Sequence, residues 1–505
     1  MQARRLFANR NAILYIVFSA AASLFLLALV QRKGHLSGIS ASTIAETLTG
    51  TPHAVTEQEH GYELLTHVPN STDVGVNDPY EGYKWHSESR LRLLTACLAR
   101  GDCHPNQVSI AIFSTFHCQW GYYDGYHGGE GVWCVGMMRA LERQGFTVLH
   151  GGDNNWKYMY HLHRQFGDMI KVIISEPGEE QRHGTFDMYK KRPDFPLGIP
   201  AWKYFNFQYY PTGWSTVVGR AWVVCAEPRI SGHWNVTVQD DGIAWVSTGA
   251  QEFHAYTDPE SSDFTYLGYD MNPDPEEIHI VPWEERPYRV YIMAKYAHYF
   301  HNGDQMVYDT DFYQRAYDEL KDEFPGFEFV AGIVDQRSEE DKQKWGPMPP
   351  PVVHNLGKLN ATEFDAEFSK ARLMLGMGAP TLSPSPYRSL AYAVPFANPH
   401  KLRDGGTNEN DRSWSFVQHD SLERVPEPYV YQVQAFNYTS FVDTIRKAMV
   451  APIEPCRFER MRHSVTGRRL SDFVNHDWKG EAAKMLELRK EGKDKQGGPS
   501  GDFEL

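Results

Sequence analysis

The pattern of apolar and polar positions between residues 108 and 225 predicts a parallel sheet. Residues 108–114 form a short, mainly apolar run, and residues 132–144 carry apolar side chains at helical spacing before Gly145. Residues 146–149 form the next short apolar run. A strand, a helix and a strand within about forty residues form a βαβ unit, whose two strands are parallel. Two further apolar runs, 171–175 and 221–225, are expected to extend this sheet.

A second series of strands and helices begins near residue 288. An apolar run at 289–294 is followed by a helix with Phe312, Ala316 and Leu320 on one face, and then by a strand at 327–334. Two such series, divided near residues 265–285, predict two doubly wound α/β domains that face each other across a cleft. The later elements are expected as strands at 352–354, 373–375 and 395–398, and as helices from Thr362, from Pro384 and through Phe441, Ile445 and Met449.

A long apolar segment lies near the N-terminus. Residues 12–30 carry no charged side chain, and a helix of that length spans the ~30 Å hydrocarbon core of a bilayer. Arg4, Arg5 and Arg10 precede it, which favours a cytosolic N-terminus. We interpret the segment as an uncleaved transmembrane signal anchor. The alternative is a cleaved signal peptide, whose apolar run is usually shorter.

The segment that follows the anchor is polar and has little periodicity, which is typical of a stem. The last residues are charged and rich in glycine. We therefore expect a cytosolic tail at 1–11, the anchor at 12–30, a stem at 31–84, an N-terminal Rossmann-like domain at 85–270, a C-terminal Rossmann-like domain at 271–461 and a C-terminal tail at 462–505.

Composition narrows the classes of function. The chain of 505 residues has a net charge of −14, which argues against a nucleic-acid partner because a phosphate backbone requires a basic face. The six cysteines contain no C-x-x-C pair, which disfavours zinc-binding and redox motifs. We expect a few disulfides instead, and the sequence does not determine which cysteines pair. Four N-glycosylation sequons agree with a luminal location: Asn70, Asn235, Asn360 and Asn437.

A first glycine-rich turn separates a predicted strand from its helix, the place where such sheets bind ligands. Gly128 and Gly129 precede Glu130 there. Glycine lets the backbone approach a ligand, and Glu130 is a candidate general base at the mouth of the cleft. The alternative is a carboxylate that only interacts favourably with the dipole of the helix.

A second glycine-rich turn follows the predicted strand 373–375. Amides and hydroxyls in this turn are candidates to hold a diphosphate without a metal ion, although an ordinary turn between strand and helix is the alternative. The turn lacks the G-K-[ST] ending of a P-loop. The candidate residues are Gly376, Gly378, Pro380, Ser383 and Ser385.

Three other features each allow two interpretations. Lys295 follows a predicted strand and is either a phosphate partner or a solvated charge. Asp309 and Asp311 form a lone Asp-x-Asp, a pattern that holds Mn²⁺ in metal-dependent sugar transferases, but Asp309 also suits a helix N-cap. The aromatic stretch 202–214 suits either stacking on sugar rings or a core.

The segments after residue 351 resemble glycosyltransferase family 18, the alpha-1,6-mannosylglycoprotein 6-beta-N-acetylglucosaminyltransferases. The matching segments are LGKLNATEFDAEFSKARLMLGMGAP (356–380), SPSPYRSLAYAVPFANPHK (383–401) and FVDTIRKAMVAPIEPCRFERM (441–461). Upstream, residues 256–269, the pair Ala294 and Lys295, and the turn before Glu130 resemble further passages of the family.

The resemblance implies a GT-B fold and an inverting, metal-independent transfer of GlcNAc from UDP-GlcNAc to a mannose 6-hydroxyl of N-glycans. It implies a single-pass type II protein of the Golgi membrane with a luminal catalytic part, anchored by its N-terminal helix. Glu130 would be the catalytic base, Gly128 and Gly129 would form the acceptor-side loop, and no metal or other cofactor would be needed. Donor binding is implied for Lys295, Gly376, Gly378, Pro380, Ser383, Ser385 and Arg388.

Two departures from the family pattern lie beside the second turn. Tyr387 and Arg388 stand where the family has Leu-Glu, and Thr381 and Leu382 stand where it has Tyr-Glu. The first of these acidic residues commonly contacts the donor ribose in GT-B enzymes. The departures leave two alternatives open, namely a catalytically impaired glycan-binding pseudoenzyme and a GT-B transferase that uses another nucleotide-sugar donor.

Overall fold

The computed structural model describes residues 81–126, 128–176, 186–209, 216–227, 229–230, 234–235, 245–246, 265–270, 278–301, 303–403, 405–407, 410, 413–423, 425–493 and 503–505. The predicted cytosolic tail, signal anchor, most of the stem and the sequon at Asn70 lie outside these residues. Across the described ranges, no helix has both the length and the apolar character that a membrane span requires.

The N-terminal domain is built on a six-stranded parallel sheet with the order β2-β1-β3-β4-β5-β9. The order reverses between β1 and β3, and the crevice at such a switch point is the usual ligand site of an open α/β sheet. The strands are β1 (Ile110–Ser114), β2 (Thr147–His150), β3 (Ile170–Ser175), β4 (Tyr204–Phe207), β5 (Val223–Cys225) and β9 (Thr265–Tyr266).

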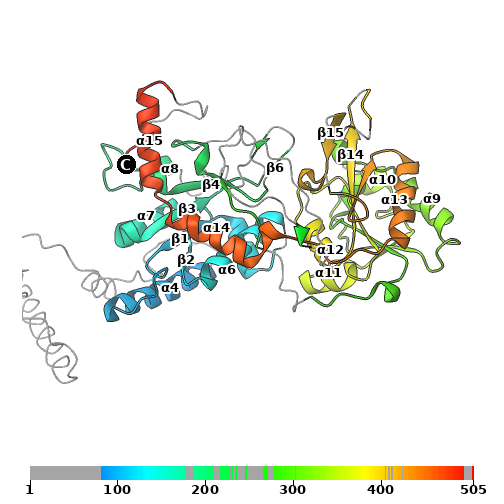
Figure 1. Ribbon diagram of the computed structural model, residues 1–505, viewed down its shortest axis with the longest axis horizontal. Helices are drawn as coiled ribbons and strands as arrows, with labels where there is room; N and C mark the ends of the chain where they lie inside the picture. Colours follow the sequence, from blue (N-terminus) through cyan, green and yellow to red (C-terminus); the bar gives the residue numbers. More distant parts are fainter. Residues whose placement is uncertain are drawn as a thin grey trace, which may run out of the picture. The chain divides into compact units, whose positions relative to one another are not determined.

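Helices lie alongside this sheet (Figure 1), and α4 and α6 contact β2. On α6, Trp133, Met137 and Leu141 are all buried, as their helical spacing predicts. The helices of this part of the chain are α4 (Glu81–Arg100), α5 (Phe116–Tyr123), α6 (Gly129–Arg143), α7 (Trp156–Phe166) and α8 (Phe186–Tyr189).

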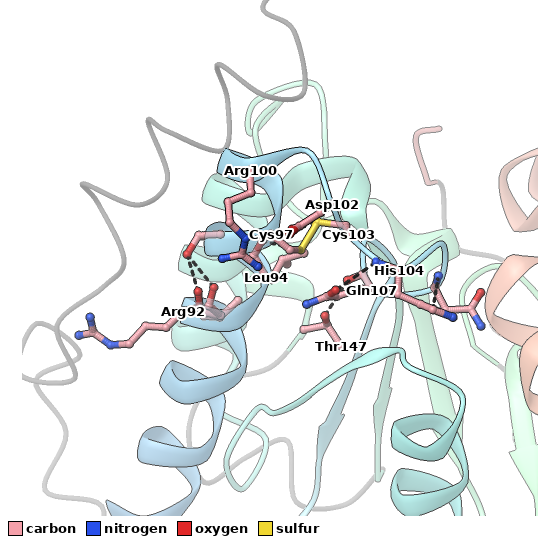
Figure 2. The surroundings of a disulfide bond; sticks show 12 residues. Arg92, Leu94, Cys97, Arg100, Asp102, Cys103, His104, Gln107 and Thr147 are labelled. Carbon is pink, nitrogen blue, oxygen red and sulfur yellow. Dashed lines mark hydrogen bonds and ion pairs between the residues drawn. A yellow bond between two sulfur atoms is a disulfide. The ribbon is translucent and has the colours of Figure 1, made fainter. Parts of the chain in front are cut away.

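Two disulfides fix helices of the N-terminal domain. Cys97, near the end of α4, is bonded to Cys103 in the loop that follows (Figure 2). Cys118 of α5 is bonded to Cys134 of α6, so the second disulfide holds these two helices together. Cys225 and Cys456 are free thiols and are buried. The structure thereby assigns the pairing that the sequence leaves open.

The aromatic stretch 202–214 contains strand β4. Tyr204, Phe205 and Phe207 are at most 5% exposed, and the ring of Phe207 stacks on Trp133 with a centroid distance of 3.8 Å. For the described part of this stretch, 202–209, the core interpretation is therefore correct, and only Tyr209 reaches the cavity described below.

The C-terminal domain contains a second sheet with the order β12-β11-β10-β13-β14-β15, in which β14 also pairs with β16. All pairs are parallel except β14 with β15. This order reverses between β10 and β13. The strands are β10 (Arg289–Ile292), β11 (Glu328–Ala331), β12 (Val353–Asn355), β13 (Leu373–Leu375), β14 (Phe396–Leu402), β15 (Trp414–Val417) and β16 (Val430–Gln434).

The helices of the C-terminal domain follow the predicted apolar faces. On α13, Phe441, Ile445 and Met449 are fully buried and pack in the second core. The helices are α9 (Asp311–Leu320), α10 (Glu339–Trp345), α11 (Ala361–Phe368), α12 (Ser385–Ala391) and α13 (Tyr438–Val450). The prediction of two doubly wound α/β domains is confirmed.

The range 462–505, which the sequence predicts as a tail, contains two helices that pack on the N-terminal domain (Figure 1). These are α14 (His463–Asn475) and α15 (Trp478–Lys490). Trp478 lies 4.7 Å from Phe205 and 5.3 Å from Trp222 between ring centroids. Phe503, near the C-terminus, is also buried. The chain thus returns to its first sheet after completing the second.

Candidate functional site

A cavity of about 1010 Å³ lies at the carboxyl ends of the strands of both sheets. The N-terminal domain lines it with residues of α5, the start of α6 and Tyr209. The C-terminal domain lines it with residues that follow β10, β11, β12 and β13. The volume is at the upper end of the ~300–1,000 Å³ that small-molecule sites occupy. The cavity therefore has room for a nucleotide-sized ligand.

Glu130 lies in the first turn of α6 and lines the cavity together with Gly128 and Gly129. A Cβ at Gly129 would collide with the ring of Tyr209, and a Cβ at Gly128 would collide with the ring of Tyr126, so a larger residue at either position would have to displace a tyrosine ring. Among the described residues, Glu130 has no hydrogen-bond or ion-pair partner. Its carboxylate is thus placed to accept a proton from a ligand.

Lys295 follows β10 and also lines the cavity. Its Nζ lies 5.4 Å from the ring centroids of Tyr126 and Tyr296, at cation–π distance. Burial lowers the pKa of Lys295, and the negative charge of Glu130 opposes this shift. A cation that is partly removed from water has few competing partners and interacts strongly with a phosphate.

The loop after β13 and the helix α12 line the cavity through Pro380, Ser383, Ser385 and Arg388. Ser383 Oγ accepts a hydrogen bond from the Ser385 amide at 3.3 Å and lies 3.2 Å from the Ser385 hydroxyl. Arg388 forms an ion pair with Asp365 of α11, which lines the cavity as well. Two hydroxyls and a guanidinium therefore reach the same ligand space as Lys295.

Gly376 and Gly378 do not line the cavity, and their amides are already bonded within the protein. The amide of Gly376 donates to the Ala397 carbonyl at 2.9 Å, and that of Gly378 donates to Gln418 Oε1 at 2.8 Å. Gly378 has a φ of +80°, and a Cβ there would collide with the backbone of Gln305. These two glycines therefore allow the turn to pack closely against the rest of the domain, and their amides are not available to a ligand in the cavity.

The described sequon asparagines and the Asp-x-Asp residues differ in their position relative to the cavity. Asn360 lines the cavity and caps α11, where its side chain accepts from the Glu363 amide at 3.0 Å. Asn437 caps α13 in the same manner, and Asn235 lies in the short strand β7 (Trp234–Asn235). Asp311 pairs with Arg315 outside the cavity lining, and the N-cap residue of α9 is Thr310 rather than Asp309.

Sequence reasoning missed a histidine–carboxylate pair next to this cavity. His117 belongs to α5, and its Nδ1 lies 2.9 Å from both carboxylate oxygens of Glu176, which follows β3 directly. A signal was present, because both residues come just after buried apolar runs, one of which is the predicted strand 171–175. The bond between them depends on the adjacency of β1 and β3, which sequence spacing does not reveal.

A buried polar cluster joins the two domains near the cavity. The Tyr387 hydroxyl donates to Glu227 at 2.8 Å and accepts from the Arg460 guanidinium at 2.9 Å. Nearby, the Tyr209 hydroxyl donates to the Leu382 carbonyl at 2.6 Å. Because Glu227 and Tyr209 belong to the first domain and Tyr387 and Leu382 to the second, these bonds hold the two walls of the cavity together.

No protein-family model matches the chain, and no curated protein matches it. The comparison with solved structures found sucrose-phosphate synthase from Thermosynechococcus elongatus at 11% identity and a TM-score of 0.38, covering 76% of this chain and 98% of that one. It also found the trehalose-6-phosphate synthase OtsA at 8% identity and a TM-score of 0.37, covering 77% of this chain and 99% of that one.

The UDP-GlcNAc 2-epimerase from Methanocaldococcus jannaschii overlaps at 10% identity and a TM-score of 0.36, covering 73% of this chain and 99% of that one. The class of fold follows from the chain's own architecture. Two parallel sheets with Rossmann-like strand orders, and a shared cavity at their carboxyl ends, make this a GT-B-like α/β fold.

Proposed function

We propose that this chain is a GT-B glycosyltransferase that uses a nucleotide sugar as donor. One observation carries the proposal. A single cavity brings Glu130 of the N-terminal domain together with Lys295, Ser383, Ser385 and Arg388 of the C-terminal domain. Cations and hydroxyls suit a diphosphate, and a carboxylate suits the removal of a hydroxyl proton. A glycosyl transfer from a nucleotide sugar needs both groups within one site.

We propose that the transfer is an inverting displacement, as the resemblance implies. The acceptor hydroxyl attacks the anomeric carbon while Glu130 takes its proton, and the bond between that carbon and the diphosphate oxygen breaks. The electron pair leaves with the diphosphate, whose developing charge interacts with Lys295, Arg388 and the two serine hydroxyls. The ion pair with Asp365 orients Arg388 and leaves further guanidinium N–H groups for the ligand.

The finer assignment rests on the resemblance to family 18. We propose UDP-GlcNAc as donor, a mannose 6-hydroxyl of an N-glycan as acceptor, and no requirement for a metal ion, because the cations of the cavity take the leaving charge. We further propose a type II Golgi membrane protein. The apolar segment 12–30, the sequons and the two disulfides, which are typical of oxidising compartments, support this location.

Transfer by the full-length, detergent-solubilised protein tests the proposal. We expect UDP release from UDP-GlcNAc in the presence of an N-glycan acceptor, unchanged by EDTA, and slower release from other nucleotide sugars. Glu130→Gln is expected to lower kcat about 100-fold or more, the usual range for loss of a general base, without changing the Kd for UDP. Glu340→Gln, at an exposed position of α10, is the matched control.

Full activity of the Glu130→Gln variant would refute the role of Glu130 as the base.

A second candidate function is a glycan-binding pseudoenzyme. The ion pair of Arg388 with Asp365 favours this candidate, because the ion pair engages a cation of the proposed donor site. Absence of nucleotide-sugar binding at millimolar concentration, together with retained glycan binding, would support this candidate. Turnover by the wild-type chain would exclude it.

A further inference from the structure

The side chain of Tyr209 lies between the two turns that carry the candidate groups of the cavity. Tyr209 follows β4 in the N-terminal domain, is only 7% exposed and lines the cavity. On one side it contacts Gly129, where an added Cβ would collide with the phenol oxygen. On the other side its hydroxyl donates to the Leu382 carbonyl at 2.6 Å. One phenol group therefore touches both the turn before Glu130 and the loop before Ser383.

A second tyrosine fixes the direction in which the Tyr209 hydroxyl donates. The Tyr269 hydroxyl donates to the Tyr209 oxygen at 2.7 Å, and a phenol has a single proton to donate. Burial raises the pKa of Tyr269 well above its usual range, so this donor keeps its proton. The Tyr269 carbonyl in turn accepts from the Thr466 hydroxyl of α14 at 3.1 Å. The Tyr209 proton is thus directed to Leu382 by a hydrogen-bonded chain of the first domain.

The backbone at Leu382 depends on its hydrogen-bond partners. Its φ is +54°, in the left-handed region that a bulky side chain rarely adopts, so the conformation persists only where neighbouring groups hold it. Within its own domain, the Leu382 amide donates to the Gln418 carbonyl at 3.0 Å, and Gln418 Nε2 donates to the Pro380 carbonyl at 3.1 Å. Tyr209 binds the Leu382 carbonyl from the other domain. The loop is therefore held from both sides.

The orientation of Leu382 affects the residue that follows it. Ser383 is 8% exposed and lines the cavity, and its Oγ accepts from the amide of Ser385 at 3.3 Å, at the first residue of α12. The peptide unit between Leu382 and Ser383 is planar and contains the carbonyl that Tyr209 binds, so a rotation of this unit would also move the Ser383 side chain. The bond from Tyr209 therefore restricts where the Ser383 hydroxyl can lie.

We propose that Tyr209 is a positioning residue for the loop 380–385: its hydroxyl holds the peptide unit between Leu382 and Ser383 and keeps the Ser383 hydroxyl in the lining of the cavity. Because the same phenol packs on Gly129, it also fixes the separation of this loop from the turn that carries Glu130. The role of Ser383 in holding a diphosphate rests on the proposed function, whereas the restraint on the loop does not.

Hydrogen exchange measures this restraint without any ligand. The amides of Leu382 and Ser385 donate to Gln418 and Ser383. The exchange rate of a peptide that contains both amides, read by mass spectrometry on the full-length protein, therefore reports the opening of the loop. In Tyr209→Phe this peptide should exchange about tenfold faster, because the Leu382 carbonyl loses a buried partner. A peptide from α13, in the same domain as the loop, should exchange at the wild-type rate.

Tyr269→Phe is the matched control. It also removes a buried phenol hydroxyl and breaks the bond between the two tyrosines, but it leaves the bond from Tyr209 to Leu382. Tyr269 is not among the residues that line the cavity. Exchange of the loop peptide should stay within about twofold of wild type in this control. Equal acceleration in both variants would overturn the proposal, because it would show a general loosening between the domains.

A double-mutant cycle on UDP binding tests whether Tyr209 acts through Ser383. Ser383→Ala should raise the Kd for UDP about tenfold, and Tyr209→Phe about threefold or more, as measured by isothermal titration calorimetry. If Tyr209 positions the Ser383 hydroxyl, Tyr209→Phe should change the Kd by less than about twofold in the Ser383→Ala background. Effects that multiply in the double variant would overturn the positioning role, because a purely structural loss does not depend on Ser383.

The two experiments separate a failure of this inference from a failure of the proposed function. If the wild-type chain binds no UDP, the proposed function fails on that result, and hydrogen exchange still decides whether Tyr209 holds the loop. If UDP binds but the loop exchanges equally in Tyr209→Phe and in the wild type, the positioning role of Tyr209 is refuted while the proposed function stands.

Discussion

At the scale of single residues, the cavity is a site of mixed charge. Lys295, Arg388 and the exposed Lys358 provide positive charge, all within one lining. Asp124, Glu130 and Asp365 provide negative charge in the same lining. Arg388 is already paired with Asp365, whereas the near neighbours of Lys295 are aromatic rings. Lys295 is therefore the cation whose interaction with an incoming diphosphate we expect to be the strongest.

Replacement of Lys295 tests this expectation. Lys295→Met should weaken UDP binding about tenfold or more, because a hydrogen bond from a charged donor contributes about 1.5–3 kcal/mol. Isothermal titration calorimetry with UDP measures the change in Kd. Lys321→Met, at an exposed position beyond α9, should leave the Kd as it is. An unchanged Kd in Lys295→Met would show that the diphosphate lies elsewhere in the cavity.

Trp120 is a second residue whose role is testable. Its indole is 37% exposed on α5, lines the cavity and packs edge-on against Phe116 and Tyr126. A partly exposed ring of this kind suits the apolar face of a sugar. Trp120→Ala should raise the KM for a saccharide acceptor about tenfold, a loss of about 1.4 kcal/mol, with the Kd for UDP unchanged.

The matched control for this prediction is Trp85→Ala, which removes an indole that is 75% exposed on α4 and lies outside the cavity lining. Initial rates at saturating donor give both KM values. If the KM for the acceptor stays at the wild-type value in Trp120→Ala, Trp120 is not part of an acceptor subsite.

At the scale of elements, α5 and α6 position most of the N-terminal side of the cavity. The Cys118–Cys134 disulfide joins them. The two helices can approach closely because Gly121 has no side chain: a Cβ at this position would lie 2.9 Å from the Gly131 carbonyl oxygen. The turn between the two helices carries Tyr126 and leads into Glu130. The disulfide therefore closes a loop around residues that line the cavity.

Removal of this disulfide should affect both stability and the site. The loop that it closes has a sequence separation of 16, for which chain entropy predicts a loss of about 3 kcal/mol. We expect Cys118→Ser with Cys134→Ser to unfold at lower urea concentration and to show a lower kcat. Cys97→Ser with Cys103→Ser is the control. Its loop spans a separation of 6, so the loss of stability should be smaller and kcat should be unchanged.

Equal effects of the two double variants on kcat would contradict this prediction, because they would show that the α5–α6 connection does not depend on its own disulfide. Comparing kcat only under conditions where each variant remains folded, as judged from its urea curve, separates the local effect from global unfolding.

At the scale of the whole molecule, the two domains share a core and a buried polar cluster. Residues of both sheets, such as Phe205 and Met374, belong to one continuous apolar cluster. Within it, Tyr387 is 1% exposed and is bonded to both Glu227 and Arg460. Tyr387, one of the two residues that stand in place of Leu-Glu in the family that the sequence resembles, therefore carries a hydroxyl with two hydrogen-bond partners. One of them, Glu227, belongs to the N-terminal domain.

Loss of that hydroxyl should destabilise the assembly of the two domains. Tyr387→Phe leaves a buried carboxylate and a buried guanidinium each short of one partner, for which we expect a loss of about 1.5–3 kcal/mol in the free energy of unfolding. Urea denaturation followed by tryptophan fluorescence measures the loss. Tyr438→Phe removes a hydroxyl bonded to Glu319 on the surface and should change the stability by about 0.5 kcal/mol or less. Equal midpoints for Tyr387→Phe and wild type would refute the importance of the cluster.

The local pattern of apolar and polar residues was sufficient to predict most of the strands and helices. Strand β13 (Leu373–Leu375) coincides with its predicted range, and α6 differs from its predicted range only at the ends. Helix α13 contains the three positions, Phe441, Ile445 and Met449, that predicted it. The helix that follows β13 was also expected, but only the structure shows that Gly376 and Gly378 bond inward while Ser383 and Arg388 line the cavity. The direction of an amide depends on its tertiary neighbours, here Ala397 and Gln418.

The sequence by itself determined the two α/β series and their order, because the periodicity of apolar side chains is a local property of strands and helices. It also placed Glu130 and Lys295 at the ends of predicted elements, where parallel sheets bind ligands. Only the tertiary structure decided that His117 meets Glu176, that Tyr387 bridges the domains, and that α14 and α15 return to the first sheet. These contacts join residues far apart in the chain, and their formation depends on which strands and helices become neighbours.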